Sequence, residues 1–291
     1  MKNFLKTPAL LMLFIILMVV FNACQKDTAG DNSNTSGKQE VMVYLNDDPS
    51  HDFTKVLVDI RYVEVKIDSS HGQHHDHNGD HDWDDDHHGH DDFGYWDTLG
   101  ISPGVYDLLQ LRNGVDTLLA TGLVGQGLIT KIRFTLGNNN EVWTDSTHSE
   151  PLSICDNRPY VYASLLSNSI DTLPGGQAII RIDFDIERSI KRRNGHYCLQ
   201  PVLRPYCGSR TGEIEGKISP PGVITLIKLY NATDTAYAIP WWHGEFKVRG
   251  LSEGTYSVLY DPLSPYQDTT INNVQVYRGR ETELPNITLH Q

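Results

Sequence analysis

Residues 178–186 read AIIRIDFDI, a stretch in which apolar and polar side chains alternate. A two-residue period of this kind predicts a β-strand with one face buried against a core. The residues expected to point inward are Ile180, Ile182, Phe184 and Ile186. The residues expected to point outward are Arg181, Asp183 and Asp185. Because such a strand must bury its apolar face against another element, further strands are needed to complete the fold.

The same period recurs earlier in the chain. Residues 41–45, 56–67 and 131–136 alternate in the same way. Within 56–67 the alternation changes phase after Tyr62, which predicts a bulge or a bend from one sheet to another. No stretch of the mature chain has the period of a long helix. Many short strands separated by turn residues indicate an all-β fold made of antiparallel sandwiches.

Motifs rich in Asn, Asp, Gly and Pro separate these strands. The motif NDDP at 46–49 predicts a turn that ends the first strand. The motif GNNN at 137–140 predicts a hairpin that joins residues 131–136 to residues 142–143. The dipeptide NG at 194–195 predicts a further reversal of the chain.

The N-terminus has the pattern of an export signal. Lys2 and Lys6 precede an uncharged, largely apolar run over residues 9–21. A membrane-spanning helix needs about 20 apolar residues, so this run is too short to span a bilayer. The pattern predicts a cleaved signal peptide over residues 1–23.

The motif FNAC at 21–24 resembles the bacterial lipobox. That resemblance implies that Cys24 is diacylated and becomes the mature N-terminus, with its acyl chains in outer-membrane lipid. Polar residues over 24–39 predict a flexible tether. The motif QKD at 25–27 resembles a short signal that directs some lipoproteins to the outer face of the outer membrane, although an ordinary polar tether explains it equally well. We expect an outer-membrane lipoprotein, with exposure on the cell surface or in the periplasm left open.

The formal net charge of −13 disfavours nucleic acid and anionic lipid headgroups as partners. Three cysteines follow Cys24, namely Cys155, Cys198 and Cys207. In an oxidising compartment one pair can form a disulfide and leave one thiol. Sequence spacing does not decide which pair forms.

Several motifs occur in the order found in one bacterial lipoprotein family. They are YLNDDP at 44–49, VEV at 63–65, GVYDLL at 104–109, NGVDTLLA at 113–120, KIR at 131–133 and DFDIERSI at 183–190. Through these motifs residues 40–206 resemble the domain of unknown function 4382, DUF4382, with residues 71–92 as an insertion. The family has no established reaction or ligand, so the resemblance implies no catalytic residue.

A polar, glycine-containing segment at 207–212 predicts a linker between two domains. Beyond it, the motif GEFKVRGLSEGTYSV at 244–258 has two alternating runs separated by glycines. This motif resembles the carboxypeptidase regulatory-like domain, and the resemblance extends over residues 213–291. It implies a second β-sandwich, of the transthyretin type, related by fold to carbohydrate-binding-like domains. Kinship of fold alone assigns no ligand.

Residues 71–92 are dominated by His and Asp, which are ligands for zinc, nickel or copper. The residues that would hold such an ion are His71, His74, His75, His77, Asp80, His81, Asp82, Asp84, Asp86, His87, His88 and His90. The same composition fits a solvated low-complexity insertion that lengthens a hairpin, and composition alone favours this second interpretation. A flexible segment loses chain entropy when it closes around an ion, so any metal affinity would be modest.

Trp241 and Trp242, with Tyr237 nearby, form an aromatic cluster in the second domain. Indole faces stack well on sugar rings, so this cluster is a candidate carbohydrate site. Packing of one tryptophan in the core and the other over a sheet edge is the favoured alternative, because most aromatic side chains serve packing.

Enzyme signatures such as GxSxG, HExxH, the Walker loop and GxGxxG are absent from the sequence. We therefore predict a non-enzymatic binding or structural component of the cell envelope, with no catalytic residues. The alternative is capture of a carbohydrate by the second domain or of a divalent metal by the His/Asp-rich segment. The expected partners are outer-membrane lipid through Cys24 and a glycan or an envelope protein, and not nucleic acid.

Overall fold

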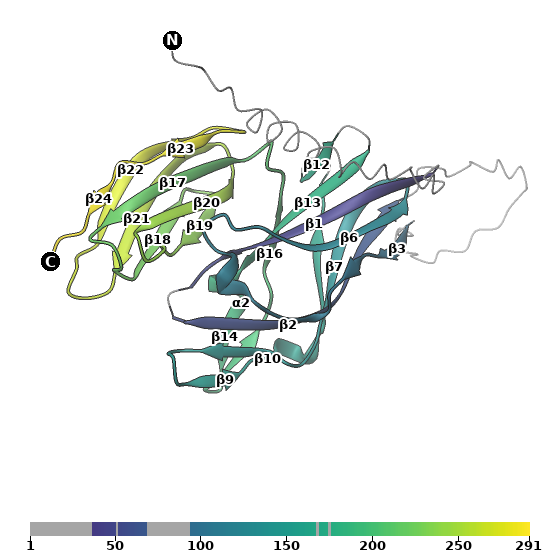
Figure 1. Ribbon diagram of the computed structural model, residues 1–291, viewed down its shortest axis with the longest axis horizontal. Coiled ribbons are helices and arrows are strands. Elements are labelled where there is room, and N and C mark those ends of the chain that lie inside the picture. Colours follow the sequence, from purple (N-terminus) through teal and green to yellow (C-terminus); the bar gives the residue numbers. More distant parts are fainter. Residues whose placement is uncertain (1–36, 51, 69–93, 167–168, 174–175) are drawn as a thin grey trace, which may run out of the picture. The chain divides into compact units, whose positions relative to one another are not determined.

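A computed structural model describes residues 37–50, 52–68, 94–166, 169–173 and 176–291, and its regular elements are almost all β-strands (Figure 1). Within these residues the helices are short, namely η2 (Leu108–Leu111), η3 (Cys155–Asn157) and α2 (Ile186–Ser189). The prediction of an all-β fold is confirmed. The predicted signal peptide, Cys24 and the predicted metal ligands between His71 and His90 lie outside the described residues.

Two large sheets and a small one form the first part of the fold. The six-stranded sheet has the order β12 (Ile170–Leu173), β13 (Gln177–Asp185), β1 (Lys38–Asp48), β6 (Thr117–Gly125) and β4 (Gly100–Ile101), with β16 (Leu203–Tyr206) also paired to β13. The seven-stranded sheet has the order β11 (Tyr160–Ser164), β7 (Leu128–Leu136), β2 (Lys55–Asp68), β8 (Glu141–Trp143) and β9 (Ser149–Pro151), with β3 (Tyr95–Thr98) and β5 (Gly104–Asp107) also paired to β2. The small sheet contains β10 (Ser153–Ile154), β15 (His196–Leu199) and β14 (Ile190–Arg193).

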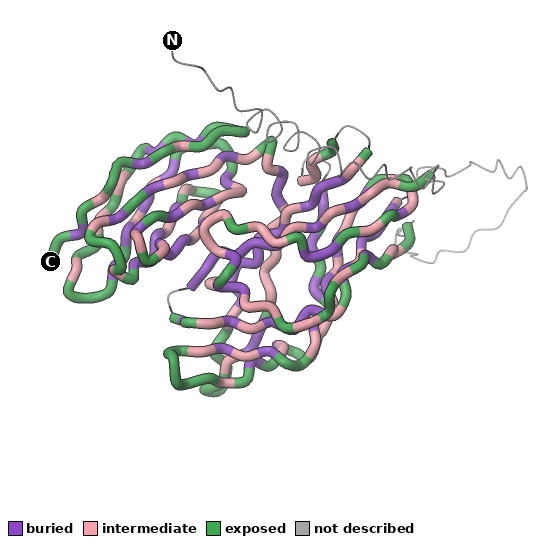
Figure 2. The backbone as a smooth tube through the Cα atoms, in the orientation of Figure 1, coloured by how far each residue is buried: buried purple, intermediate pink, exposed green. Residues whose placement is uncertain are grey.

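The two large sheets share one hydrophobic core, and we call this part the first sandwich. Val43 of β1 and Ile182 of β13 come from the six-stranded sheet, whereas Val58 of β2 and Phe134 of β7 come from the seven-stranded sheet. Buried and less buried residues alternate along most of these strands (Figure 2). The predicted inward positions Ile180, Ile182, Phe184 and Ile186 are all buried.

Two four-stranded sheets enclose a second core, and we call this part the second sandwich. One sheet contains β20 (Glu245–Leu251), β17 (Gly212–Ser219), β23 (Glu281–Glu283) and β24 (Ile287–Thr288). The other has the order β19 (Thr235–Ala238), β18 (Thr225–Tyr230), β21 (Gly254–Pro262) and β22 (Thr269–Val276). Phe246 and Tyr260, from opposite sheets, meet edge to face in this core with ring centroids 6.0 Å apart.

The bulge predicted in the second strand is confirmed, but it lies before Tyr62 and not after it, so Tyr62 does not share the inward face of Ile60 as predicted. In β2, Val58 and Ile60 are buried before the bulge and Val63 and Val65 after it, while Tyr62 is exposed. The pairing of β2 with β7 shifts register between Ile60 and Tyr62. One extra residue in a strand moves every later side chain to the other face, so the bulge keeps both halves of β2 apolar toward the core.

The hairpin predicted at GNNN, 137–140, is wrong. Strands β7 and β8 both pair antiparallel with β2, β7 at Ile60–Asp68 and β8 at Lys55–Leu57. The chain therefore keeps its direction through residues 137–140, which interrupt the pairing along β2 and do not form a hairpin. The buried carboxylate of Asp59 holds this segment by accepting a hydrogen bond from the backbone N–H of Asn139 at 3.2 Å, while Asn140 Oδ1 accepts one from the Asp59 N–H at 2.8 Å. From Ile60 to Leu57 of β2 the neighbouring chain runs from Leu136 to Glu141, so the extra residues belong to the neighbour, and their polar groups form hydrogen bonds to Asp59.

Two further predictions at one end of the six-stranded sheet are wrong. The motif NDDP does not turn the chain at residue 46, because β1 continues to Asp48 in parallel pairing with β13. Asp183 and Asp185, expected to face water, are 2% and 0% exposed. Segments later in the chain cover this end of the sheet, and the local alternation of the sequence cannot show that covering.

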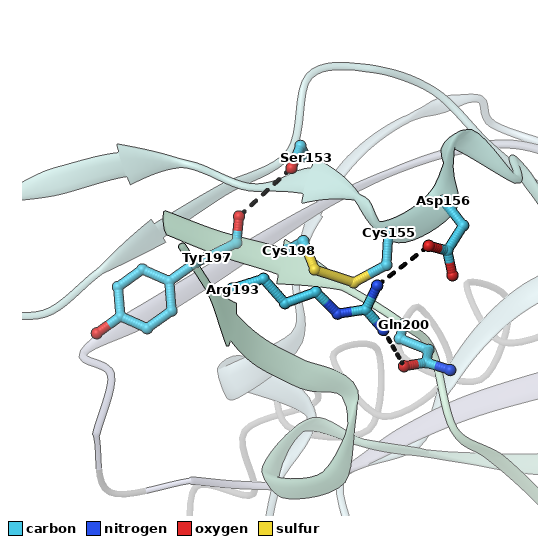
Figure 3. The surroundings of a disulfide bond; sticks show 7 residues. All are labelled: Ser153, Cys155, Asp156, Arg193, Tyr197, Cys198 and Gln200. Atoms are coloured by element: carbon cyan, nitrogen blue, oxygen red, sulfur yellow. Dashed lines mark hydrogen bonds and ion pairs between the residues drawn. A yellow bond between two sulfur atoms is a disulfide. The ribbon is translucent and has the colours of Figure 1, made fainter. Parts of the chain in front are cut away.

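The structure pairs Cys155 of η3 with Cys198 of β15, with a Cα–Cα distance of 5.2 Å (Figure 3). Beside this disulfide, the Arg193 guanidinium donates to Asp156 Oδ1 at 3.1 Å and to Gln200 Oε1 at 3.4 Å. Cys207 keeps a buried free thiol. This result settles the choice among three cysteines that spacing left open.

Candidate functional site

A groove of about 350 Å³ contains both tryptophans of the predicted carbohydrate site. Residues from the first sandwich form one side and residues from the second sandwich form the other. The lining residues are Phe53, Thr54, Arg112, Gly222, Val223, Ile224, Ile239, Pro240, Trp241 and Trp242. The groove is therefore mostly aromatic and aliphatic, with one cation.

A tight turn after β19 presents the two indoles. The N–H of Trp241 donates to the carbonyl of Glu245 at 2.8 Å, and the N–H of Gly244 donates to the carbonyl of Trp241 at 2.8 Å. Gly244 has a φ of +90°, and a Cβ there would lie 2.5 Å from the carbonyl oxygen of Ile218. Glycine is thus required at this position for the turn to approach β17 closely.

The two tryptophans have different surroundings. Trp242 is 81% exposed and touches the ring of His243 edge to face at 5.3 Å. Trp241 is half-buried, and the guanidinium of Arg112 lies 4.8 Å from its ring centroid. An exposed indole next to an indole stacked with a cation gives a surface that suits the apolar face and the hydroxyls of a sugar.

Burial lowers the pKa of Arg112, against the opposing effects of Asp47 and Asp107. Its Nε is buried and has no hydrogen-bond partner among the described residues. The guanidinium nevertheless keeps its charge, since arginine titrates far above neutral pH. Arg112 can therefore offer hydrogen-bond donors to a ligand in the groove.

Tyr237, the third residue of the predicted carbohydrate site, does not line the groove. It lies on β19, where burial raises the pKa of its phenol, with the carboxylates of Glu187 and Asp185 adding to the effect. The structure thus brings Trp241 and Trp242 together and places Tyr237 next to a group of buried carboxylates.

This acid cluster consists of Asp47, Asp48, Asp183 and Asp185, at the ends of β1 and β13. All four are at most 5% exposed. In the parallel pairing, Asp48 lies opposite Asp185 and Asp47 opposite Phe184. The sequence analysis did not predict this cluster. The signal that could have predicted it is the presence of acidic residues in two predicted strands, in NDDP at 46–49 and in DFD at 183–185.

Arg204 of β16 stabilises the cluster. Its Nε is 2.9 Å from Asp183 Oδ2 and its second terminal nitrogen is 3.0 Å from Asp48 Oδ2. The remaining terminal nitrogen donates to the carbonyl of Thr235 at 2.7 Å and lies 3.4 Å from Asp234 Oδ1, both in the second sandwich. One guanidinium therefore joins carboxylates of both sandwiches.

The electrostatics of the cluster follow from its burial. Burial raises the pKa of Asp183 to about 6, with Arg204 opposing the shift and Asp185 adding to it. Burial also raises the pKa of Asp47, and the charge of Asp183 adds to the effect. The cluster does not resemble a metal centre, because no three His, Cys, Asp or Glu side chains are arranged to hold an ion in the part of the chain that the structure describes.

Among the described residues, no helix has the length and apolar character needed to cross a membrane. A family model described as "Domain of unknown function (DUF4382)" matches residues 38–201, in agreement with the resemblance found over 40–206. The resemblance of residues 213–291 to a carboxypeptidase regulatory-like domain stays a prediction. A search of curated proteins gives no match.

Comparison with solved structures gives distant similarities. The shaft pilin SpaA of Lactobacillus rhamnosus GG is 9% identical over 87% of this chain and 98% of its own, with a TM-score of 0.22. The minor pilin GBS52 of Streptococcus agalactiae is 8% identical over 87% of this chain and 97% of its own, with a TM-score of 0.22. A cohesin–X–dockerin complex of Acetivibrio cellulolyticus is 22% identical over 27% of this chain and 56% of that chain, also with a TM-score of 0.22. These values carry no statement about a ligand or a partner.

Proposed function

This chain belongs to the family of the domain of unknown function DUF4382, and we propose that it is a cell-envelope lipoprotein with a binding or structural role and no catalytic activity. In this proposal Cys24 carries the lipid that holds the protein in the outer membrane. The two sandwiches then form the part of the protein that meets other envelope or surface molecules.

The observation that carries the proposal is the disulfide between Cys155 and Cys198. Structural disulfides are typical of oxidising compartments such as the periplasm and the cell surface, and they are rare in the cytosol. This bond agrees with the export signal and with the FNAC motif at 21–24. The groove supports a binding role, because it presents the exposed Trp242 beside the Arg112–Trp241 stack.

The anchor can be tested with the variant Cys24→Ser in the full-length chain. We expect the wild-type protein to be in the membrane fraction and to incorporate labelled fatty acid, whereas the variant incorporates none and leaves that fraction, because serine lacks the thiol that is acylated. Cys207→Ser is the matched control, since it removes the free thiol of the described residues and should stay lipidated. Labelling of the Cys24→Ser variant would refute the anchor.

Protease treatment of intact cells then separates the two orientations. A protein on the cell surface is cleaved while a periplasmic marker stays intact, and a periplasmic protein is cleaved only after the outer membrane is opened. Finding the protein in the cytosolic fraction would overturn the envelope proposal altogether.

Carbohydrate capture by the groove is a second candidate, favoured by the exposed Trp242 beside the Arg112–Trp241 stack. On a glycan array, we expect binding that Trp242→Ala weakens about fivefold, because an aromatic stacking contact contributes about 1 kcal/mol. Tyr237→Phe is the control, since Tyr237 lies outside the groove and should leave binding unchanged. A blank array, or equal binding by Trp242→Ala, would count against this candidate.

A further inference from the structure

The outer face of the seven-stranded sheet carries a group of aromatic side chains that the groove does not include. They are Tyr62 of β2, Trp96 of β3, and Tyr160 and Tyr162 of β11, and we call them the aromatic sheet face. Tyr62, Tyr160 and Tyr162 are 56%, 52% and 53% exposed. Single exposed aromatic side chains are ordinary, but four aromatic side chains on one face of a sheet form a patch of the kind that marks an interaction site.

Strand register places these residues on one face. Tyr160 and Tyr62 both lie opposite Thr135 of β7, from its two sides. Tyr162 and Glu64 both lie opposite Arg133 in the same way. Residues opposite each other in a sheet share a face, and two strand spacings separate Tyr160 from Tyr62 by about 10 Å.

Arg133 at the centre of the face holds the rings in place. Its guanidinium lies 4.4 Å from the ring centroid of Trp96 and 5.4 Å from that of Tyr160. Glu64 accepts two hydrogen bonds from it, at 2.7 and 2.6 Å. The rings of Trp96 and Tyr162 are also in contact, with centroids 5.9 Å apart. A cation fixed by a bidentate carboxylate and stacked between rings reduces the side-chain entropy that a ligand would have to overcome.

The core does not need these rings. The neighbouring residues that point inward, Val63, Phe134 and Val161, are at most 9% exposed and supply the packing on the other side of the same strands. The exposed rings therefore add little to the hydrophobic core. The exposed rings are therefore free to contact another molecule.

The chemistry of the face selects the class of ligand. The charges of Arg133 and Glu64 compensate each other in their ion pair, so this pair adds no net charge, while Lys66 and Lys131, paired two residues farther along, lie on the same face. The hydroxyl groups of Thr98, Thr135 and Ser164 occupy neighbouring positions of the pairing. Flat rings surrounded by hydroxyls suit sugars, whose C–H faces stack on aromatics while their hydroxyls form hydrogen bonds. An aliphatic protein interface would instead present Leu, Ile or Val around Arg133.

We propose that the aromatic sheet face binds an extended polysaccharide of the β-1,4-linked type, with sugar rings stacked on Tyr160, Tyr162 and Tyr62. The site is distinct from the Trp242 groove. It also does not depend on the lipid anchor, so the outcome of the Cys24 experiment neither supports nor refutes it.

The test uses the full-length protein in detergent micelles, with microcrystalline cellulose and chitin as the probes in pull-down measurements. We expect the wild type to bind one of these polymers, and each of Tyr62→Ala and Tyr162→Ala to weaken binding about fivefold, as loss of one stacking contact predicts. Because both side chains are more than half exposed, the variants should fold, which circular dichroism checks. Tyr277→Ala is the matched control, since Tyr277 is 50% exposed but lies in the second sandwich.

Two results would overturn the proposal. One is failure of the wild type to bind either polymer. The other is binding that Trp242→Ala abolishes while Tyr62→Ala and Tyr162→Ala retain it, which would assign the polysaccharide to the groove.

Discussion

Asp47 is a buried carboxylate without a hydrogen-bond partner for either oxygen among the described residues. Such a side chain is expensive to ionise, because neither water nor a donor compensates the charge. Its neighbours Asp48 and Asp183 share Arg204 and Asp185 pairs with Arg188, so both of these cations are already engaged, and the charge of Arg112 only partly opposes the raised pKa of Asp47. At the residue scale, therefore, Asp47 is the group most sensitive to pH and to substitution.

The raised pKa values of Asp47 and Asp183 give a pH dependence of definite sign. A carboxyl whose pKa is higher in the folded than in the unfolded state favours folding below its unfolded pKa, and this stability is lost as pH rises through the folded pKa. With Asp183 near 6, stability falls as the pH rises from about 4 to about 6 and stays lower above that range.

We predict that Asp47→Asn makes the protein more stable at pH 7.5, by about 1–3 kcal/mol, and flattens the dependence of stability on pH. Asparagine has nearly the same shape and no charge to bury. Urea unfolding at pH 5 and pH 7.5 measures both effects. Asp261→Asn is the control, since Asp261 is exposed and should change stability little. A less stable Asp47→Asn variant at pH 7.5 would show that the carboxylate is compensated in the protein.

At the scale of elements, β2 organises the first sandwich, because β3, β5, β7 and β8 all pair with it. The His/Asp-rich residues 71–92 fall in the chain between β2 and β3, two strands that pair directly with each other. Their ends are adjacent whatever lies between them, so the fold does not depend on the composition of this segment. That arrangement agrees with an insertion and leaves the metal hypothesis to experiment.

If residues 71–92 capture metal, calorimetry of the full-length protein with zinc should show binding that deletion of the segment removes. Histidine ligands must be deprotonated, so the binding should weaken as pH falls below about 6.5. Thermal unfolding of the deletion variant without zinc is the control, and its midpoint should stay close to that of the wild type. Undiminished zinc binding by the deletion variant would refute the hypothesis.

Considered as a whole, residues Gly37–Gln291 form one unit in which polar contacts join the two sandwiches. Asn113 Nδ2 donates to the carbonyl of Ile239 at 2.7 Å, and Asp116 pairs with Arg249 at 3.1 Å. Arg204 adds the contacts to Asp234 and Thr235 described above. The residues NGVD at 113–116, part of one motif through which the chain resembles the family, thus also contact the second sandwich.

We predict that Arg204→Met destabilises the whole protein by about 3–5 kcal/mol, because it leaves Asp48 and Asp183 buried without their cation. Urea unfolding measures the loss, and hydrogen exchange in β16 and β19, the strands joined by Arg204, should become faster. Arg193→Ala is the control, since its ion pair with Asp156 is exposed and should contribute less than about 1 kcal/mol. Partial recovery is expected when Asp183→Asn is added to Arg204→Met, since one uncompensated charge is then removed. Equal stability of Arg204→Met and wild type would refute this account.

Features that depend on neighbouring residues could be predicted from the sequence. Alternation placed Ile182 and Phe184 in the core, and the change of phase near Tyr62 predicted the bulge that β2 has between Ile60 and Tyr62. Asn194 and Gly195, with φ values of +52° and +84°, form the reversal between β14 and β15. In each case the backbone period or the turn conformation is encoded within a few residues, so no distant contact has to be known.

Features that depend on distant partners were decided by the tertiary structure. Asp183 and Asp185 alternate like surface residues, yet they are buried because β16 supplies Arg204 and further segments exclude water from that end of the sheet. Likewise, Cys155 pairs with Cys198 and not with Cys207, and Trp242 is exposed in a groove whose other side belongs to the first sandwich. Local alternation determines which strands form and which face is apolar. Long-range packing determines which polar side chains are buried and which aromatic side chains stay exposed to solvent. The reason is that burial depends on all the segments that pack over a residue, including segments distant in the sequence.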